Sequence, residues 1–143
     1  MTVEEVMKEL ESLGSEQTRK IYRNHGADIA QFGVSIAHLK KIAKKLKGNH
    51  KVGIELLHSQ NVDAIYLSQF VVDEKRVSID DLEAVIECTN YYMLLDNVVA
   101  TLMARNQDLV KEFLYEYLDS ENDRKKQVGY SAYSMILGSY EDD

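Results

Sequence analysis

The sequence contains no proline and no tryptophan, and it has a single cysteine, Cys88. Without proline, nothing in the chain interrupts long helices or stiffens a linker. One cysteine excludes an intrachain disulfide and is typical of a reducing compartment, so we expect a cytoplasmic protein. The acidic N-terminal residues lack the pattern of a secretory signal, and no apolar run approaches the ~20 residues of a membrane span. We therefore expect no membrane partner.

Motifs for metal, nucleotide or nucleophilic chemistry are also missing. The four histidines do not form a zinc-binding pair on one helix, and Cys88 has no cysteine partner. The sequence has no glycine-rich phosphate loop and no G-x-S-x-G nucleophile turn. We expect no metal and no cofactor.

The 143 residues show helical periodicity almost throughout. Apolar residues recur every three to four positions, and Ser, Asn or Gly stands at most of the breaks. The predicted helices, about nine in number, cover roughly 3–13, 16–25, 36–47, 50–59, 62–72, 79–88, 90–104, 106–118 and 122–137. Ser15, Ser35, Asn61, Ser78 and either Thr89 or Asn90 are the predicted N-caps. Antiparallel pairs of this length predict an all-α helical-repeat solenoid, with an irregular helical bundle as the alternative.

Positive charge is concentrated in one quarter of an otherwise acidic chain. The net charge is −7, yet residues 17–51 hold nine basic residues and one acid, Asp28, so this segment carries +8 and the remainder −15. Such a segment on an acidic body is typical of a surface that meets a polyanion. The alternative is a set of solvated lysines along one helix.

One carboxylate stands alone in a long uncharged stretch. Asp96 is the only charged residue among the 17 between Glu87 and Arg105. Tyr92 precedes it by four residues and so shares its helix face. A carboxylate in apolar surroundings costs free energy unless it is paired, and such groups are enriched at functional sites. The alternative is a structural acid that caps another helix or pairs with a lysine.

Residues 21–64 carry several short motifs at fixed offsets. They are Tyr22-x-x-His25-Gly26-Ala27, Phe32-Gly33-Val34, Leu39-Lys40-Lys41-Ile42-Ala43-Lys44, Asn49-His50 and Asn61-Val62-Asp63-Ala64. This pattern resembles the AlkD-like DNA alkylation repair family of HEAT-like repeat DNA glycosylases, and the chain is identified as a short, divergent member. The similarity extends more weakly to about residue 137.

The length and the lack of any domain boundary in the pattern predict a single domain over 1–143. The resemblance implies a HEAT-like repeat protein that holds duplex DNA, alkylated or not, on a concave basic face. It implies hydrolysis of the N-glycosidic bond of cationic N-alkylated purines, without metal and without base flipping. It assigns the catalytic carboxylate to Asp96 and its aromatic partner to Tyr92, where a fixed negative charge would stabilise an oxocarbenium-like transition state. Together with the basic segment, it predicts DNA-binding residues at Arg23, Lys40, Lys41, Lys44, Lys45, Lys47, Lys51, Lys126 and Gln127.

Several positions depart from the family pattern. The aromatic walls of the active family cannot be tryptophan here, and its two DNA-contacting arginines fall on Ile65 and Gln127. The C-terminal repeats of longer members have no counterpart in the 143 residues. Three functions therefore stay open: a glycosylase that uses Asp96, a catalytically degenerate module that binds nucleic acid, and a protein-binding helical repeat.

Overall fold

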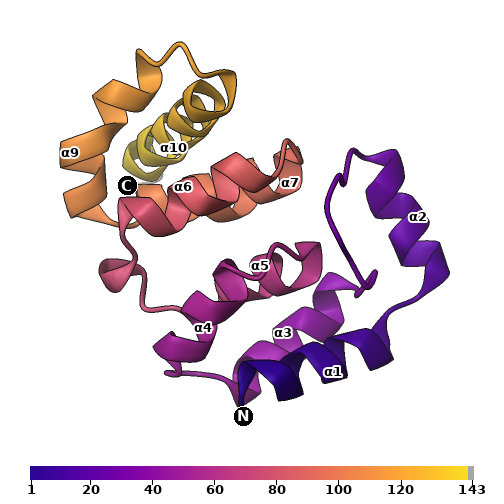
Figure 1. Ribbon diagram of the computed structural model, residues 1–143. Coiled ribbons are helices and arrows are strands. Elements are labelled where there is room, and N and C mark those ends of the chain that lie inside the picture. Colours follow the sequence, from indigo (N-terminus) through magenta and orange to yellow (C-terminus); the bar gives the residue numbers. More distant parts are fainter. Residues whose placement is uncertain (142–143) are drawn as a thin grey trace.

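The computed structural model describes residues 1–141, and every regular element in that range is helical (Figure 1). The elements are α1 (Val3–Leu13), α2 (Glu16–Asn24), α3 (Ile36–Lys45), α4 (His50–Leu57), α5 (Val62–Ser68), η1 (Glu74–Arg76), α6 (Ile79–Cys88), α7 (Tyr92–Leu94), η2 (Leu95–Val99), α8 (Ala100–Ala104), α9 (Gln107–Leu118) and α10 (Asp123–Glu141). α7, η2 and α8 follow one another without a break and form one helix over 92–104. Over the described residues the chain thus has nine helices and one short 3-10 turn, and the all-α prediction is confirmed.

The helices form two layers that rise together from α1 to α10 (Figure 1). In one layer each helix packs against the next in the order α3, α5, the 92–104 helix and α10, and we call it the site layer. The back layer consists of α1, α4, α6 and α9. α4 packs against α5, α6 against η2, and α9 against α10, so each back helix supports a site-layer helix. α2 contributes no buried residue and stands outside both layers.

The core runs along the stack in two adjoining clusters. One joins α1, α3, α4 and α5 around Leu10, Leu39 and Leu56. The larger one joins α5 to α10 around Ile65, Leu94 and Tyr117. A core in which each repeat mainly contacts its neighbours is the pattern of a solenoid.

Side-chain caps set most helix starts as the sequence predicts. Ser15, Ser35 and Asn61 each accept a hydrogen bond from the amide three residues ahead. Ser78 and Asp81 form a reciprocal capping box at the start of α6. These caps satisfy amides that have no partner within their helices, and they fix where the chain turns.

Three predicted boundaries are wrong, and one is the end of the last helix, since α10 continues to Glu141 rather than ending near 137. α5 ends at Ser68 rather than near 72, because the amides of Phe70 and Val71 donate to carbonyls only three residues earlier and the chain continues in tight turns. Neither Thr89 nor Asn90 caps the helix over 92–104. Its N-cap is Tyr91, which makes no side-chain cap, while the Thr89 hydroxyl donates to Asp28.

Candidate nucleic-acid interface

Residues 27–34, which we call the tie loop, cross from α2 to α3 past the starts of two site-layer helices. Asp63, fully buried in the first turn of α5, accepts amides of Phe32 at 2.6 Å, Gly33 at 3.2 Å and Val34 at 2.8 Å. Burial raises the pKa of the Asp63 carboxyl, and these backbone hydrogen bonds act in the opposite direction. The Asn61–Ala64 motif therefore holds the tie loop in place.

The family-like motifs at 22–34 have the same structural role. The Tyr22 hydroxyl donates to the Val34 carbonyl at 2.7 Å, and an Arg19 guanidinium nitrogen donates to the Phe32 carbonyl at 2.9 Å. Gly33 has φ +75°, and a Cβ there would lie 2.6 Å from the Ser15 carbonyl oxygen. Only glycine fits this close approach without strain. The motifs fasten α2 to the body.

The tie loop also positions the start of the 92–104 helix. Asp28 accepts the amide of Asn90 at 2.8 Å as well as the Thr89 hydroxyl. At the end of α2, Nδ1 of His25 lies 3.4 Å from the Tyr92 hydroxyl. Tyr92 is 43% exposed, so this predicted site residue stands at the surface between α2 and the site layer.

Asp96 lies half-buried in the site layer, on the turn η2, where the helix widens. The amide of Ala100 donates to the carbonyl of Leu95, five residues earlier, which is the pattern of a π-turn. One carboxylate oxygen, Oδ1, accepts the Ser131 hydroxyl at 2.8 Å and Nε2 of Gln127 at 3.2 Å, both from α10. π-turns inside α-helices occur frequently at functional sites.

The sequence analysis missed Ser131, Asp28 and Asp63. Ser131 follows Gln127 by one helical turn, so it had to share the face of the residue predicted to reach the site. Asp63 stands in a family-like motif and Asp28 is the one acid of the basic segment, but the sequence did not indicate their roles, because each binds a segment about 30 to 60 residues away.

The predicted basic residues are spread over several surfaces. Lys40 and Lys45 lie on opposite flanks of α3: the Lys40 ammonium lies 5.9 Å from the centre of the Phe70 ring, whereas Lys45 pairs with Glu9 of α1 at 2.7 Å. Arg23 on α2 pairs with Glu16 at 2.8 Å. Lys51 lies on α4 in the back layer. The predicted lysines that are exposed and form no ion pair within the described residues are Lys40, Lys41, Lys44, Lys47, Lys51 and Lys126.

The two positions assigned to the family's arginines differ in their surroundings. Gln127 bonds to Asp96 at the surface of the site layer. Ile65 has no exposed surface and lies in the core, so a side chain at this position does not reach a phosphate group. The neighbouring Tyr66 is the residue of α5 that faces outward.

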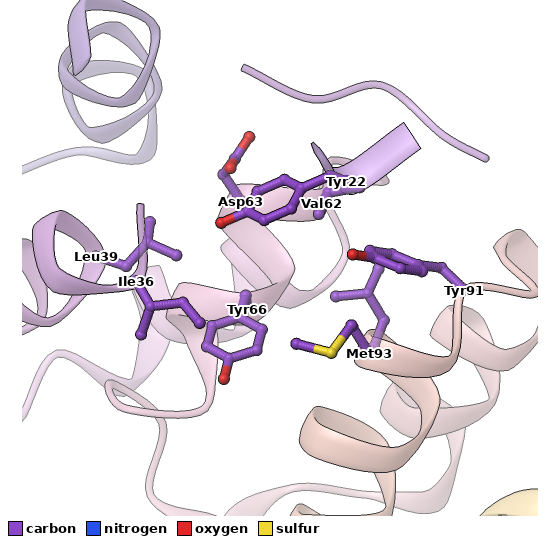
Figure 2. A pocket seen from close by; sticks show the side chains of 9 residues that line it. Tyr22, Ile36, Leu39, Val62, Asp63, Tyr66, Tyr91 and Met93 are labelled. Atoms are coloured by element: carbon purple, nitrogen blue, oxygen red, sulfur yellow. The ribbon is translucent and has the colours of Figure 1, made fainter. Parts of the chain in front are cut away.

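A narrow pocket opens where α2, α3, α5 and α7 meet, and Figure 2 shows its side chains. Tyr22, Tyr66, Tyr91 and Met93 line it together with Asp63. Burial is the main factor that raises the pKa of Tyr22 to about 12 and that of Tyr91 to about 12, so both hydroxyls keep their protons at neutral pH. The free space is about 20 Å³, enough for one water molecule and far too small for a nucleobase.

Two further features are absent from residues 1–141, the part of the chain that the structure describes. No three histidine, cysteine or acidic side chains converge as a metal ion would require. No helix combines the length and the apolar character needed to cross a bilayer.

Two layers of stacked helix pairs with a shared, linear core define a HEAT-like helical-repeat protein. A solved structure agrees: it belongs to a family described as related to the HEAT-like repeat DNA glycosylases, with affinity for branched DNA structures. It matches with a TM-score of 0.85 and 36% identity, and the match covers 96% of this chain and 58% of that one. The predicted HEAT-like fold is confirmed.

A family model described as "DNA alkylation repair enzyme" matches residues 6–136, and the chain belongs to this family. Two curated relatives are the uncharacterized proteins Lin0241 of Listeria innocua and Lmo0209 of Listeria monocytogenes, 31% and 29% identical over 144 residues. Each match covers 97% of this chain and 64% of the relative, so the chain spans about three fifths of the length of these proteins.

Proposed function

We propose that this chain binds DNA and that exposed lysines of α3 and the turn after it hold the phosphate backbone. The proposal rests on the exposure and the lack of ion-pair partners, in the described part of the chain, of three lysines, Lys41, Lys44 and Lys47. They are exposed and form no ion pair within the described residues, although the chain as a whole has an excess of acids. Phosphate contacts by such cations release condensed counterions, and this release supplies most of the affinity of non-specific DNA binding.

The family and its described relative support this function. The solved neighbour belongs to a family with affinity for branched DNA, and most of this chain matches it. The Lys40 flank of α3 faces α5, so DNA held by this helix would lie against the site layer that carries Tyr92 and Asp96. We propose duplex regions of DNA as the ligand of the lysines.

The binding test is a salt titration with a matched control. Lys41 and Lys44 are changed together to alanine, and a second variant carries Lys75→Ala and Lys111→Ala, which removes the same charge from η1 and α9. Affinity for a duplex is measured by fluorescence anisotropy from low to moderate salt. We expect the slope of log K against log salt to fall by about 1 for each lysine of the first pair and to stay unchanged in the control. Equal slopes in both variants would exclude α3 as the phosphate-binding element.

A second function, excision of cationic alkylated purines, is supported by the setting of Asp96. Ser131 and Gln127 hold its carboxylate on a widened turn in the site layer, and both donors are neutral. A fixed negative charge at this place would stabilise a positively charged sugar as the cationic base leaves. The absence of tryptophan and of an arginine at position 127 weakens substrate binding, so we propose excision far slower than in members that keep those residues.

Excision is tested with DNA that carries N7-methylguanine. Release of the free base is measured for the natural sequence and for Asp96→Asn, with Asp119→Asn at the C-terminal end of α9 as a matched control. We expect release to stop in Asp96→Asn and to persist in the control. No release by the natural sequence would leave binding as the function, and equal release by Asp96→Asn would remove this carboxylate from the reaction.

A further inference from the structure

An aromatic pair, the exposed Phe70 and the partly buried Tyr66, stands on the site layer beside α3 and has no part in the mechanism above. Phe70 follows α5 directly and leaves 39% of its surface in water. The Tyr66 ring, one helical turn earlier, meets Phe70 edge to face, with 5.9 Å between ring centres and an angle of 61°. The neighbours Leu67 and Val71 are buried, so the core below Phe70 is already filled.

A cation accompanies the pair. The Lys40 ammonium lies 5.9 Å from the centre of the Phe70 ring, within the range of a cation–π contact. Lys40 is exposed and belongs to the same helix as the proposed phosphate contacts Lys41 and Lys44. An aromatic ring flanked by lysines is the combination with which proteins bind unpaired nucleotides, because the ring stacks on a base while the ammonium group meets its phosphate.

A row of packed side chains leads from Tyr66 toward the predicted site. Tyr66 lines the narrow pocket together with Met93 and Tyr91 of the next site-layer helix (Figure 2). Tyr91 in turn meets the exposed Tyr92 ring edge to face, with 5.7 Å between ring centres. Because Tyr91 is itself buried, these ring contacts connect α5 to the start of the 92–104 helix beneath the surface.

Paired bases cannot use such rings, because the faces of a base inside a duplex are covered by its neighbours. The Phe70 ring also carries no hydrogen-bonding group with which to read base edges in a groove. Since the pocket is too small for a base, an unpaired base would lie on the exposed ring of Phe70 rather than enter the pocket.

We infer that Phe70, with Tyr66 behind it and Lys40 beside it, is a stacking site for an unpaired base at the junction of single- and double-stranded DNA. This inference rests on the proposed function, in which α3 holds the adjoining duplex. The ligand class is DNA with a gap, flap or single-stranded tail next to a paired region.

Because the chain contains no tryptophan, the fluorescence of one introduced tryptophan reports on a single position. Phe70→Trp introduces a single tryptophan at the proposed stacking position, and Tyr115→Trp places one on α9, where the tyrosine is 81% exposed. Each full-length variant is titrated with a blunt duplex and with the same duplex carrying a four-nucleotide gap. Tryptophan emission and, independently, the anisotropy of a dye on the DNA are recorded.

We expect gapped DNA to quench the tryptophan at position 70 and not the one at 115, and blunt duplex to quench neither. Phe70→Leu should bind gapped DNA about tenfold more weakly than the natural sequence and blunt duplex equally well. Tyr115→Leu should change neither affinity.

Two results would overturn the inference and leave the proposed function intact: gapped DNA that binds without quenching position 70, or a Phe70→Leu loss that is equal for both DNAs. If anisotropy shows no binding of either DNA at low salt, the proposed function fails and the inference fails with it.

Discussion

Two aspartates of the site layer use their carboxylates in opposite ways. Asp63 on α5 is fully buried, and both of its oxygens accept backbone amides of residues 32–34. Asp96 on η2 is half-buried, and its Oδ1 accepts two side chains of α10. A buried acid that satisfies backbone amides fixes the path of the chain. An acid held by side chains near the surface is free to exchange those partners for water or a ligand.

The comparison of Asp63 with Asp96 shows that the residues of the family-like motifs differ in role from those at the candidate interface. Tyr22, Gly33 and Asp63 all belong to the attachment of the tie loop, although they lie within the segment that most resembles a DNA repair protein. The residues that face the candidate interface are less distinctive in sequence. A match in the first segment is therefore stronger support for the fold than for the chemistry.

The largest expected difference between the two acids is in stability. Asp63→Ala leaves three amides without acceptors, and because each unsatisfied buried amide costs about 1–3 kcal/mol, we expect a loss of about 3 kcal/mol or more. Asp96→Ala should cost less than about 1 kcal/mol, since Gln127 and Ser131 can turn to water. The free energy of unfolding of both variants is measured by urea titration followed by circular dichroism.

A second observable identifies where Asp63→Ala acts. Amide hydrogen exchange should rise first in the tie loop and α2, which that carboxylate attaches to the body, and not in α9. If the two alanine variants lose equal stability, the division between a structural and a site acid is wrong.

Much of the fold could be predicted because its signals are local. Apolar spacing and the caps Ser15, Ser35, Asn61 and Ser78 specify helix starts within a few residues of themselves. The early end of α5 was missed because two further apolar residues, Val71 and Val72, continue the helical pattern while the chain turns. Apolar periodicity indicates which residues face the core, but it does not indicate the backbone conformation that places them there.

The candidate site was predictable only in part. Asp96 attracted attention because it is alone in an uncharged stretch, but its partner Ser131 belongs to α10 and lies 35 residues away in the sequence. Phe70 gave no signal, since a phenylalanine in an apolar run is normally a core residue. Its exposure follows from the turn after Ser68, which periodicity does not predict.

A smaller effect is expected from a methyl group added to the tie loop. Gly33→Ala combines an unfavourable positive φ with contacts of 2.5 Å to the Arg19 side chain and 2.6 Å to the Ser15 carbonyl, so we expect a loss of about 2 kcal/mol or more. Gly48→Ala is the matched control, because φ there is +82° but nothing lies within 4 Å, and it should cost about 1 kcal/mol. Both losses are measured by urea titration. Equal losses of stability in the two variants would mean that the tie loop adjusts to the added methyl group and is not a rigid support for Tyr92.

A third acid, Asp81, is a surface carboxylate, and its substitution is expected to cause the smallest loss of stability of the changes considered. Burial raises its pKa, but hydrogen bonds from His58 at 2.8 Å and from Ser78 outweigh it, and the net pKa is lowered. An acid with a lowered pKa in the folded state stabilises the fold above its ordinary pKa, and this contribution is lost as the pH falls.

We expect Asp81→Asn to cost less than about 1 kcal/mol at pH 7, because the pair is partly exposed. The difference from the natural sequence should shrink as the pH falls below about 4, the ordinary pKa of an aspartate in the unfolded chain, and on through the lowered pKa of Asp81 in the folded protein. Urea titrations of both proteins between pH 7 and pH 3 measure this difference. A gap that stays constant down to pH 3 would show that Asp81 acts through the shape of its cap and not through its charge.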